Sequence, residues 1–416
     1  MLKTNNKLKT ISTTVFILTS IVIALNPFPH TTTIYEISYY LALVLTIFYL
    51  SQKRELAFLH NPLTVPVAIF TLWAFIGLFG ALDIQTSIHD FNSHLLKYIA
   101  LFAMLVTFTN TSKRLKILAW LVVISVTISS ISGLYTFYIQ GGHHLSQRFI
   151  LSDPEYPVGP VGVMAMFALL FGLTLFRIEK NSLMRFGLSI CLVILAVTVF
   201  AVQSRAIMLA MPLVFVVMFW GNKKLLVIFL ITALGAGFFT MEKFRGNPVK
   251  ANYSPRLTIN YIAFLVFKEH PVKGIGFGIN TFGNPKFIDH EAYRKKVPKS
   301  IRNPTVVISS PHNMYMSMAV RSGLPGLLMY IYILYVALKM CVKVISCKGN
   351  NFARLWGYCL GSCLILLIVY GFFDVVFLKF LEILLCLSFS TVSICYTMVY
   401  EKISPGLNEP EYASTS

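Results

Sequence analysis

Residues 158–177 read VGPVGVMAMFALLFGLTLFR, an apolar stretch that is interrupted by no charge until its last residue. Twenty residues of α-helix span about 30 Å, which is the thickness of the hydrocarbon core of a bilayer. Across the chain, 56% of the 416 residues are hydrophobic and 12% are charged, about half the charged fraction of an ordinary soluble domain. The stretch is therefore predicted to be a transmembrane helix, and the composition excludes a soluble protein.

Apolar runs of similar length recur from one end of the chain to the other. The run nearest the N-terminus follows Lys3, Lys7 and Lys9, but no small-residue cleavage site comes after it, so we expect a retained helix rather than a signal peptide. The predicted fold class is an all-α polytopic membrane protein with about twelve transmembrane helices. Their predicted positions are residues 11–26, 34–50, 63–82, 94–110, 115–139, 158–177, 184–202, 205–220, 224–240, 313–338, 355–373 and 375–400.

One connection is far longer than the others and divides the chain. Residues 1–240 would hold nine helices, 241–311 an outward loop, 312–400 three further helices, and 401–416 a polar cytoplasmic tail. Within the loop, residues 256–270 have the pattern of an amphipathic helix, and the glycines of residues 271–278 indicate turns. The loop carries twelve Lys and Arg against four Asp and Glu. It is either a solvated lid that touches lipid headgroups or an electropositive roof over an anionic substrate.

The short connections alternate between cationic and nearly uncharged, which predicts the orientation of the chain. With both termini in the cytoplasm, every inward connection carries cations, and the outward ones mainly carry acids such as Asp83, Asp90, Asp153 and Glu155. The net charge of +19 then reflects anchors near anionic headgroups, so it does not imply a nucleic-acid partner. The inward cations are Lys53, Arg54, Lys113, Arg114, Lys116, Arg177, Lys180, Arg185, Lys223, Lys224, Lys343, Lys348 and Arg354.

Four arginines stand outside the inward connections, where an arginine does not serve as an orientation signal. Arg205 opens the helix predicted at 205–220, Arg148 lies in an outward loop, Arg256 opens the loop helix, and Arg321 falls in an otherwise apolar run. A guanidinium here either extends to the interface or binds a phosphate through its planar fork of donors. For Arg321, a structural role and a substrate role remain equally open.

A histidine marks the point where the long loop re-enters the membrane. Pro311 precedes His312, Asn313 follows it with an amide that can donate and accept, and Gly323 and Gly326 come about three turns later. The glycines would allow the backbone to bend or a neighbouring helix to approach closely. A single histidine at a membrane boundary is more often a capping residue than a catalyst, so the pattern alone is only suggestive.

Three segments, in this order, resemble the bacterial O-antigen ligase and polymerase superfamily. They are residues 204–210 (SRAIMLA), 270–278 (HPVKGIGFG), and 311–313 (PHN) with 323–327 (GLPGL). The last is similar to the ligase signature of His, then Asn, Ser or Gln, nine residues, Gly, two residues, Gly and a small β-branched residue. Leu327 stands where that signature has its β-branched residue.

This resemblance implies a membrane glycosyltransferase of the GT-C type in the inner membrane of a Gram-negative bacterium, with a periplasmic active site. Its donor would be O-antigen linked to undecaprenyl diphosphate, its acceptor would be lipid A-core, and transfer would invert the anomeric carbon. His312 would be a base or orient the acceptor, and Arg205 and Arg256 would bind the diphosphate. Further substrate contacts are expected from Arg148, Asn313, Arg321 and Lys273.

No cofactor or metal is predicted. The outward loops hold no Asp-x-Asp pair and no His/Asp/Glu cluster, and none of the seven cysteines falls in them, so cationic side chains would replace a metal at the diphosphate.

Other functions remain open at this point. An O-antigen polymerase would use the same donor and a second lipid-linked chain as acceptor. A protein-glycosylating oligosaccharyltransferase is a more distant relative, but it would be expected to have an added soluble domain. A polysaccharide flippase would place charges along the bundle, and Asp374, Lys379 and Glu382 are the hint of this. We interpret those three as an interfacial turn with a local ion pair.

Overall fold

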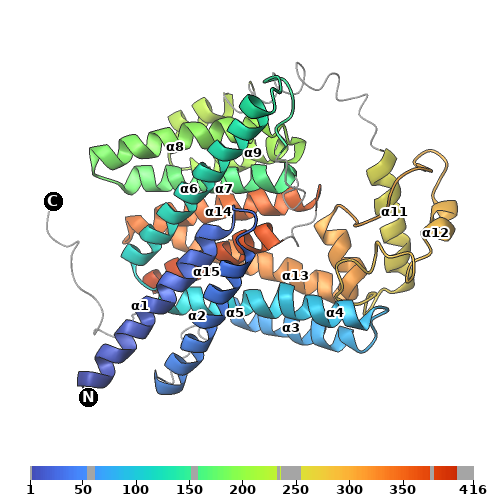
Figure 1. Cartoon of the computed structure of the whole chain (residues 1–416), viewed down its shortest axis with the longest axis horizontal. Coiled ribbons are helices and arrows are strands. Elements are labelled where there is room, and N and C mark those ends of the chain that lie inside the picture. The colour runs from blue at the N-terminus through green and yellow to red at the C-terminus, as the bar shows by residue number, and fades with distance from the viewer. Residues whose placement is uncertain are drawn as a thin grey trace.

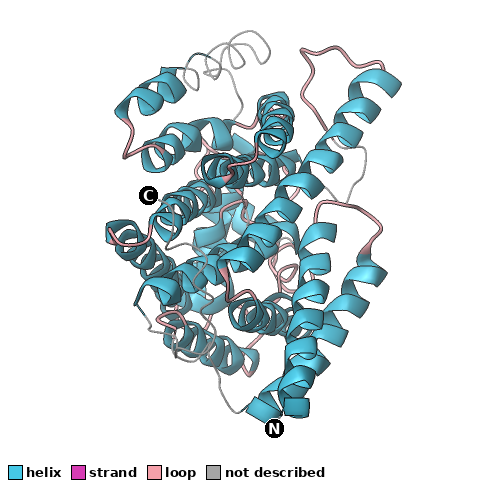
Figure 2. Ribbon diagram, turned by 90° about the vertical axis from the view of Figure 1, so that its left-hand side faces the viewer, coloured by secondary structure: helices cyan, strands magenta, loops and turns pink. Residues whose placement is uncertain are grey.

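The computed structural model describes residues 2–53, 61–150, 158–231, 235, 254–374 and 379–400, and in these residues it is built from helices without strands (Figure 2). Nine of the described helices are long and apolar enough to cross a membrane, and α3 (Thr64–Leu78) and α9 (Arg205–Met218) are shorter apolar helices. The all-α, multi-pass prediction is therefore confirmed. The number twelve stays a prediction, because the run at 224–240 extends beyond the described residues, as does the tail at 401–416.

The helices follow the predicted runs closely, with two short π-helical segments, η2 and η3, added where runs continue past an α-helix. The remaining elements are α1 (Leu2–Leu25), α2 (Thr32–Lys53), α4 (Ile84–Asp90), η2 (Phe91–Leu96), α5 (Lys97–Phe108), α6 (Ser112–Leu134), η3 (Tyr135–Gln140), α7 (Val158–Ile178), α8 (Ser182–Ala201), α11 (Ser254–Glu269), α12 (His290–Lys296), α13 (Met314–Ser346), α14 (Asn351–Gly371) and α15 (Lys379–Tyr400).

The helical body has a buried centre and a lipid-facing rim. In the most apolar part of α7, 78% of the residues are buried, and α14 and α15 are also largely buried, whereas α8 buries 22% of its residues and α2 buries 28%. Helix α14 packs against α7, α9, α13 and α15. Figure 1 shows α8 and α9 along one edge of the body and α2, α3 and α5 along the opposite edge. The large apolar side chains that α2, α3 and α8 expose are suited to lipid rather than water.

Residues 254–311 form a small helical region at one end of the body, which we call the outer end (Figure 1). Helix α11 matches the amphipathic helix expected at 256–270, while α12 was not predicted. The region has its own apolar core, in which Ile262, Val266, Phe282 and Ile288 pack against Val320 of α13. This core, separate from that of the body, fixes the region to α13.

Helix α13 reverses direction at Gly323, where the backbone leaves the helical region with φ 69° and ψ −174°. The hydroxyl of Tyr330 donates to the sulfur of Met314 at 3.0 Å, although sixteen residues of straight helix would separate them by about 24 Å. The two halves of α13 therefore lie side by side. A single helix was expected over 313–338, and the glycine there produces a sharper change than a bend. The reversal places Met314 against Tyr330 and the end of α14.

The reversal leaves backbone carbonyls without helical donors, and a segment of the outer region supplies the missing ones. Pro325 has no N–H for the carbonyl of Arg321, four residues earlier, and the amide of Gly276 donates to that carbonyl at 3.2 Å. The amide of Ile275 donates to the carbonyl of Val320 at 2.8 Å. Buried backbone groups must be paired, so the glycine-rich segment completes the broken helix.

Two further hydrogen bonds close the same contact. The amide of Leu324 donates to the carbonyl of Pro271 at 2.8 Å, and the indole Nε1 of Trp73 on α3 donates to the carbonyl of Ser322 at 2.9 Å. We call residues 271–276 and 320–324 together the latch. Each bond contributes about 1 kcal/mol, and together they tie the outer region, α3 and both halves of α13 to one another.

An ion pair holds the opposite, inner end of the body. The Nζ of Lys116 lies 2.8 Å from a carboxylate oxygen of Glu179, whose side chain is 6% exposed. The hydrogen bond from Lys116 lowers the pKa of Glu179 below its ordinary value of 4.5. Because the folded pKa lies below the unfolded one, this carboxylate stabilises the fold fully above pH 4.5. The contribution is lost as the pH falls through the lowered folded value.

Replacing Glu179 with glutamine should lower the free energy of unfolding by about 1 kcal/mol at pH 7. Thermal unfolding of the detergent-solubilised protein measures this difference, which should shrink as the pH is lowered below 4.5. The control is Glu291→Gln, since that carboxylate is 68% exposed in the outer region. A difference that stays constant with pH would show that the charge of Glu179 does not contribute to stability.

Candidate functional site

His312 stands at the junction between the outer region and α13 in a conformation that few residues adopt. Its φ is 48°, in the left-handed region, and only His30 and Gln203 share a positive φ among the non-glycine residues that the structure describes. Such a conformation costs of order 1 kcal/mol and is held by its surroundings. Asn313 then caps α13, because its Oδ1 accepts from the amide of Met316 at 3.0 Å and its Nδ2 donates to the carbonyl of Phe372 at 3.2 Å.

The imidazole of His312 is paired with a carboxylate from the end of α14. The Nδ1 of His312 lies 3.3 Å from Oδ1 of Asp374, and the hydroxyl of Tyr370 donates to Oδ2 of the same carboxylate at 3.2 Å. Tyr370 is buried at 1% exposure, whereas His312 and Asp374 are 35% and 26% exposed. The tyrosine thus anchors the carboxylate, and the carboxylate orients a histidine that a substrate can reach.

This arrangement suits proton transfer. With Asp374 accepting from Nδ1, the Nε2 of His312 keeps its lone pair and can take a proton from a hydroxyl. The carboxylate then stabilises the imidazolium that forms.

Arg148 is held beside the start of α9 by a run of backbone contacts. Its Nε donates to the carbonyl of Val202 at 2.9 Å, the amide of Phe149 donates to the carbonyl of Ala201 at 2.9 Å, and Gln203 donates from Nε2 to the carbonyl of Ser146 at 3.2 Å. The strained Gln203, with φ 47°, comes two residues before Arg205. The loop of Arg148 and the turn before Arg205 are therefore one joined structure.

The N-terminal ends of α7, α9 and α13 converge around Tyr370 and Asp374. A Cβ on Gly159 would lie 2.2 Å from the hydroxyl of Tyr370, and one on Gly162 would lie 2.5 Å from Ile207 near the start of α9. On the other side, a Cβ on Gly371 would lie 2.8 Å from Met314 at the start of α13. Helix N-termini present partial positive charge and unpaired amides, so their convergence favours an anion.

Two cations lie near this centre. Arg148 and Arg256 are close enough for their charges to act on the hydroxyl of Tyr370. Arg205 occupies the first position of α9, as the sequence predicted, and is partly exposed. Four of the candidate residues, His312, Arg148, Arg205 and Arg256, thus lie on elements that meet at one place.

Arg321 and Lys273 are placed elsewhere. Arg321 is 2% exposed, its Nε donates to the carbonyl of Phe277 at 2.9 Å, and its guanidinium lies 4.2 Å from the centre of the ring of the same residue. Of the two roles left open for Arg321, these contacts favour the structural one. Lys273 is exposed at the outer end of α3, where its Cδ would lie 3.4 Å from a Cβ on Gly80. Neither is part of the cluster around Tyr370.

Sequence reasoning missed Asp374 and Tyr370. We interpreted Asp374 as part of a turn with a local ion pair, but it contacts His312, which is 62 residues earlier. Glu382 does not pair locally either, because it lies 2.8 Å from Nδ1 of His94 on η2. The side chain of Lys379 lies outside the described residues. An isolated acid at the outer end of a predicted helix was the available signal, since an acid there needs water or a partner.

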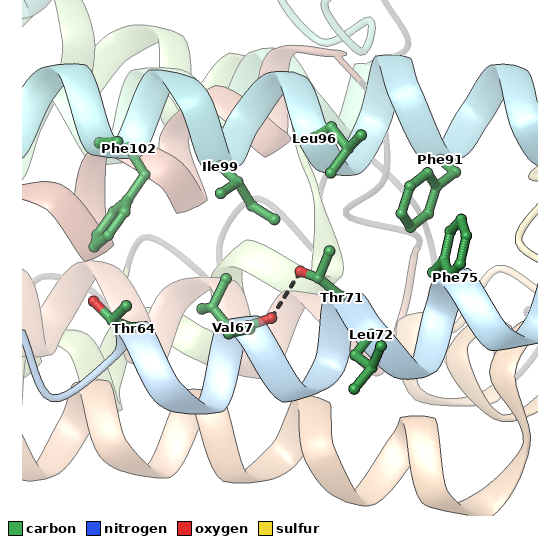
Figure 3. Close-up of a pocket in the computed structure, with 11 residues that line it drawn as sticks. Thr64, Val67, Thr71, Leu72, Phe75, Phe91, Leu96, Ile99 and Phe102 are labelled. Atoms are coloured by element: carbon green, nitrogen blue, oxygen red, sulfur yellow. Dashed lines mark hydrogen bonds between the residues drawn. The ribbon is translucent and has the colours of Figure 1, made fainter. Parts of the chain in front are cut away.

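An apolar groove runs along a different part of the body. It lies between α3 and the η2 and α5 segment, and it encloses about 530 Å³ (Figure 3). No group of three or more His, Cys, Asp or Glu side chains in the described part of the chain is arranged to hold a metal ion.

Comparison with known proteins connects the site to a family. Residues 190–331 match the family model described as O-antigen ligase. No curated protein gives a significant match to the chain. The matched residues include Arg205, Arg256, the latch and His312, and they exclude Arg148 and Asp374. Over these residues, which make up about a third of the chain, the protein is similar to the O-antigen ligase family.

Proposed function

We propose that this protein is an O-antigen ligase, which transfers the polysaccharide from undecaprenyl diphosphate to lipid A-core at the periplasmic face of the inner membrane. The observation that carries the proposal is the pair of His312 and Asp374, which lies where three helix N-termini and the arginines meet. The site thus has a proton acceptor next to an anion site. This is the combination that a hydroxyl attacking a sugar diphosphate requires.

In the proposed reaction, the diphosphate of the donor binds to Arg148, Arg205 and Arg256 at the N-termini of α7 and α9. The acceptor hydroxyl attacks the anomeric carbon while Nε2 of His312 takes its proton. The bond between the anomeric carbon and the diphosphate oxygen breaks, and undecaprenyl diphosphate leaves with that electron pair. One displacement inverts the anomeric carbon.

Charge on the leaving group is the main electrostatic demand of this step. Arg148 is held by its hydrogen bond to the carbonyl of Val202, and the helix N-termini are part of the fold, so these groups can stabilise the developing charge without reorganising. We therefore propose a reaction that needs no metal ion, with arginine side chains in its place. Asn313 would act through the geometry of His312, because both ends of its amide already bond within the protein.

The orientation belongs to the same proposal. The site and the outer region would face the periplasm, and both termini would lie in the cytoplasm. The inner end then holds the ion pair of Lys116 and Glu179 and the cation of Arg177, which lies 4.7 Å from the centre of the Phe219 ring. Cations at this end agree with the preference of inward connections for lysine and arginine.

Arg205→Lys and Arg256→Lys test the anion site, because lysine keeps the charge and loses the bidentate fork. Each should lower kcat/KM for transfer from the lipid-linked donor to lipid A-core by between about 10- and 100-fold. Purified protein in detergent with both lipids measures this. The control, Arg185→Lys, replaces an arginine at the inner end that lies 4.6 Å from the centre of the Phe176 ring.

The same assay separates the two enzyme functions that the family allows. A ligase should elongate lipid A-core and leave a second lipid-linked chain unextended. If the wild-type protein extends the lipid-linked chain instead, it is a polymerase. Unchanged kcat/KM in both lysine variants would show that Arg205 and Arg256 do not form part of the anion site.

A further inference from the structure

The groove between α3 and the η2 and α5 segment has a chemistry of its own. Figure 3 shows Thr64 and Phe102 near one end and Phe75 and Phe91 close together at the other. The rings of Phe75 and Phe91 have centroids 6.1 Å apart, and Phe91 also packs against Phe277, next to the latch. From Thr64 to Phe75 the groove follows α3 for about 16 Å. This length would accommodate a hydrocarbon chain that lies along α3. The rings of Phe75 and Phe91 would then stand at its outer end.

The lining offers almost nothing to a polar ligand. Nine of the eleven lining residues are apolar, and the hydroxyl of Thr71 already donates to the carbonyl of Val67 at 2.7 Å. Leu72 in the lining is 60% exposed, so the groove opens on a surface of α3 that faces the bilayer. At this depth water is absent and an empty groove would forfeit its dispersion contacts. Hydrocarbon is therefore the occupant that the groove fits.

Two lipids take part in the proposed reaction, and their anatomy distinguishes them. The tail of the donor is bonded directly to the diphosphate, so it must begin where the leaving group lies. The acyl chains of the acceptor are separated from the reacting hydroxyl by the core oligosaccharide. The groove belongs to α3, η2 and α5, whereas the site belongs to the ends of α7, α9, α13 and α14. Figure 1 shows α3 and α5 on the opposite edge of the body from α8 and α9. None of the residues that line the groove comes from α7, α9 or the loop of Arg148, where the diphosphate is proposed to bind, so the groove fits an acyl chain of the acceptor better than the tail of the donor.

The outer end of α3 and α4 also carries charge that complements a phosphorylated headgroup. Lys273 lies against the outer end of α3, and Lys286 is close enough to Asp83, the cap of α4, for its charge to act on that carboxylate. Both lysines are exposed. A lipid whose acyl chain enters the groove would bring phosphates to the level of these ammonium groups.

We propose that the groove between α3 and α5 binds an acyl chain of the glycolipid acceptor, with its phosphates facing Lys273 and Lys286. This rests on the proposed function, since it takes lipid A-core as the acceptor. The groove acts as an anchor at a distance from the chemistry. It holds the lipid while the core oligosaccharide reaches toward His312.

Ala68→Phe and Ala103→Phe fill the groove from its two walls, and Ile69→Phe adds the same bulk to α3 outside the groove. Each filling variant should raise KM for acylated lipid A-core about tenfold, because the added ring removes the dispersion contacts between the chain and the groove. The filling variants should keep the wild-type kcat and the wild-type KM for the donor. The Ile69→Phe variant should have wild-type values of all three constants. With deacylated lipid A-core, wild type and filling variants should have equal KM, because no chain remains to occupy the groove.

A measurement without turnover separates this inference from the proposed function. Acylated lipid A-core alone should raise the unfolding temperature of the wild type and of Ile69→Phe, and should not raise that of Ala103→Phe. If the wild type transfers nothing but this pattern holds, the proposed function fails and the lipid site stands. The inference is overturned if the filling variants raise KM for the donor instead, or if they change neither KM nor the stabilisation by lipid A-core.

Discussion

Replacing His312 with asparagine should lower kcat for sugar transfer by between about 10²- and 10⁴-fold, the usual contribution of a general base. Asparagine is the suitable replacement, because it tolerates the positive φ of this position better than most residues and cannot accept a proton at neutral pH. The fold and substrate binding should survive. Purified protein assayed with lipid-linked donor and lipid A-core gives kcat and KM, and thermal unfolding confirms the fold.

Asp374→Asn and Tyr370→Phe test the support of that histidine. Asp374→Asn removes the charge that orients the imidazole and stabilises the imidazolium, so kcat should fall by about 10²-fold with KM nearly unchanged. Tyr370→Phe removes one hydrogen bond to the carboxylate and should cost about tenfold or less. If His312→Asn retains most of the wild-type kcat, the histidine is not the proton acceptor and the proposed mechanism is wrong.

Replacing Gly323 or Gly274 with alanine should release the latch. Both glycines have positive φ, and a Cβ on Gly323 would lie 1.9 Å from the carbonyl oxygen of Val272, while one on Gly274 would lie 2.4 Å from the carbonyl carbon of Arg321. No flexible side chain can give way, since the clashes are with backbone. We expect each variant to lose more than about 3 kcal/mol of stability. Thermal unfolding should show this, and limited proteolysis should cut the outer region faster.

Two glycines provide matched controls for the latch. Gly142 has φ 63° with nothing within 4 Å of an added Cβ, so Gly142→Ala should show the cost of strain alone, about 1 kcal/mol. Gly187 in α8 has open space and helical φ, so Gly187→Ala should be neutral or slightly stabilising. Latch variants that are as stable as Gly142→Ala would mean that the segment from 271 to 276 does not hold α13.

The helical framework was readable from the sequence because a bilayer imposes a strong rule. A run of about twenty apolar residues must form a helix there, since no other local structure pairs its own backbone groups. The bounds of α7, α8 and α14 lie within a few residues of the predicted runs. The reversal at Gly323 was harder to predict, since the glycine indicated freedom but its direction depends on donors that lie 45 or more residues away, such as the amides of Ile275 and Gly276.

The site could be predicted only in part. His312, Arg205 and Arg256 stood out because polar residues at a membrane boundary need a reason, and the structure brings their elements together. Asp374 could not be connected to His312, because one sequence holds no information on which of the outer acids faces which loop. Arg321 shows the reverse problem. It looked available for a substrate, yet its guanidinium bonds to the carbonyl of Phe277 next to the latch, a contact that only tertiary structure reveals.

The most direct measurement of the central claim is the lipopolysaccharide profile of a bacterial strain that lacks this protein, together with its level of lipid-linked donor. The strain should carry complete core without attached polysaccharide, and polymerised donor should accumulate. Complementation with the wild type should restore attachment, and equal amounts of His312→Asn protein in the membrane should not. Core that carries a single repeat would identify a polymerase instead, and donor that stalls on the cytoplasmic side would contradict the claim by identifying a transporter.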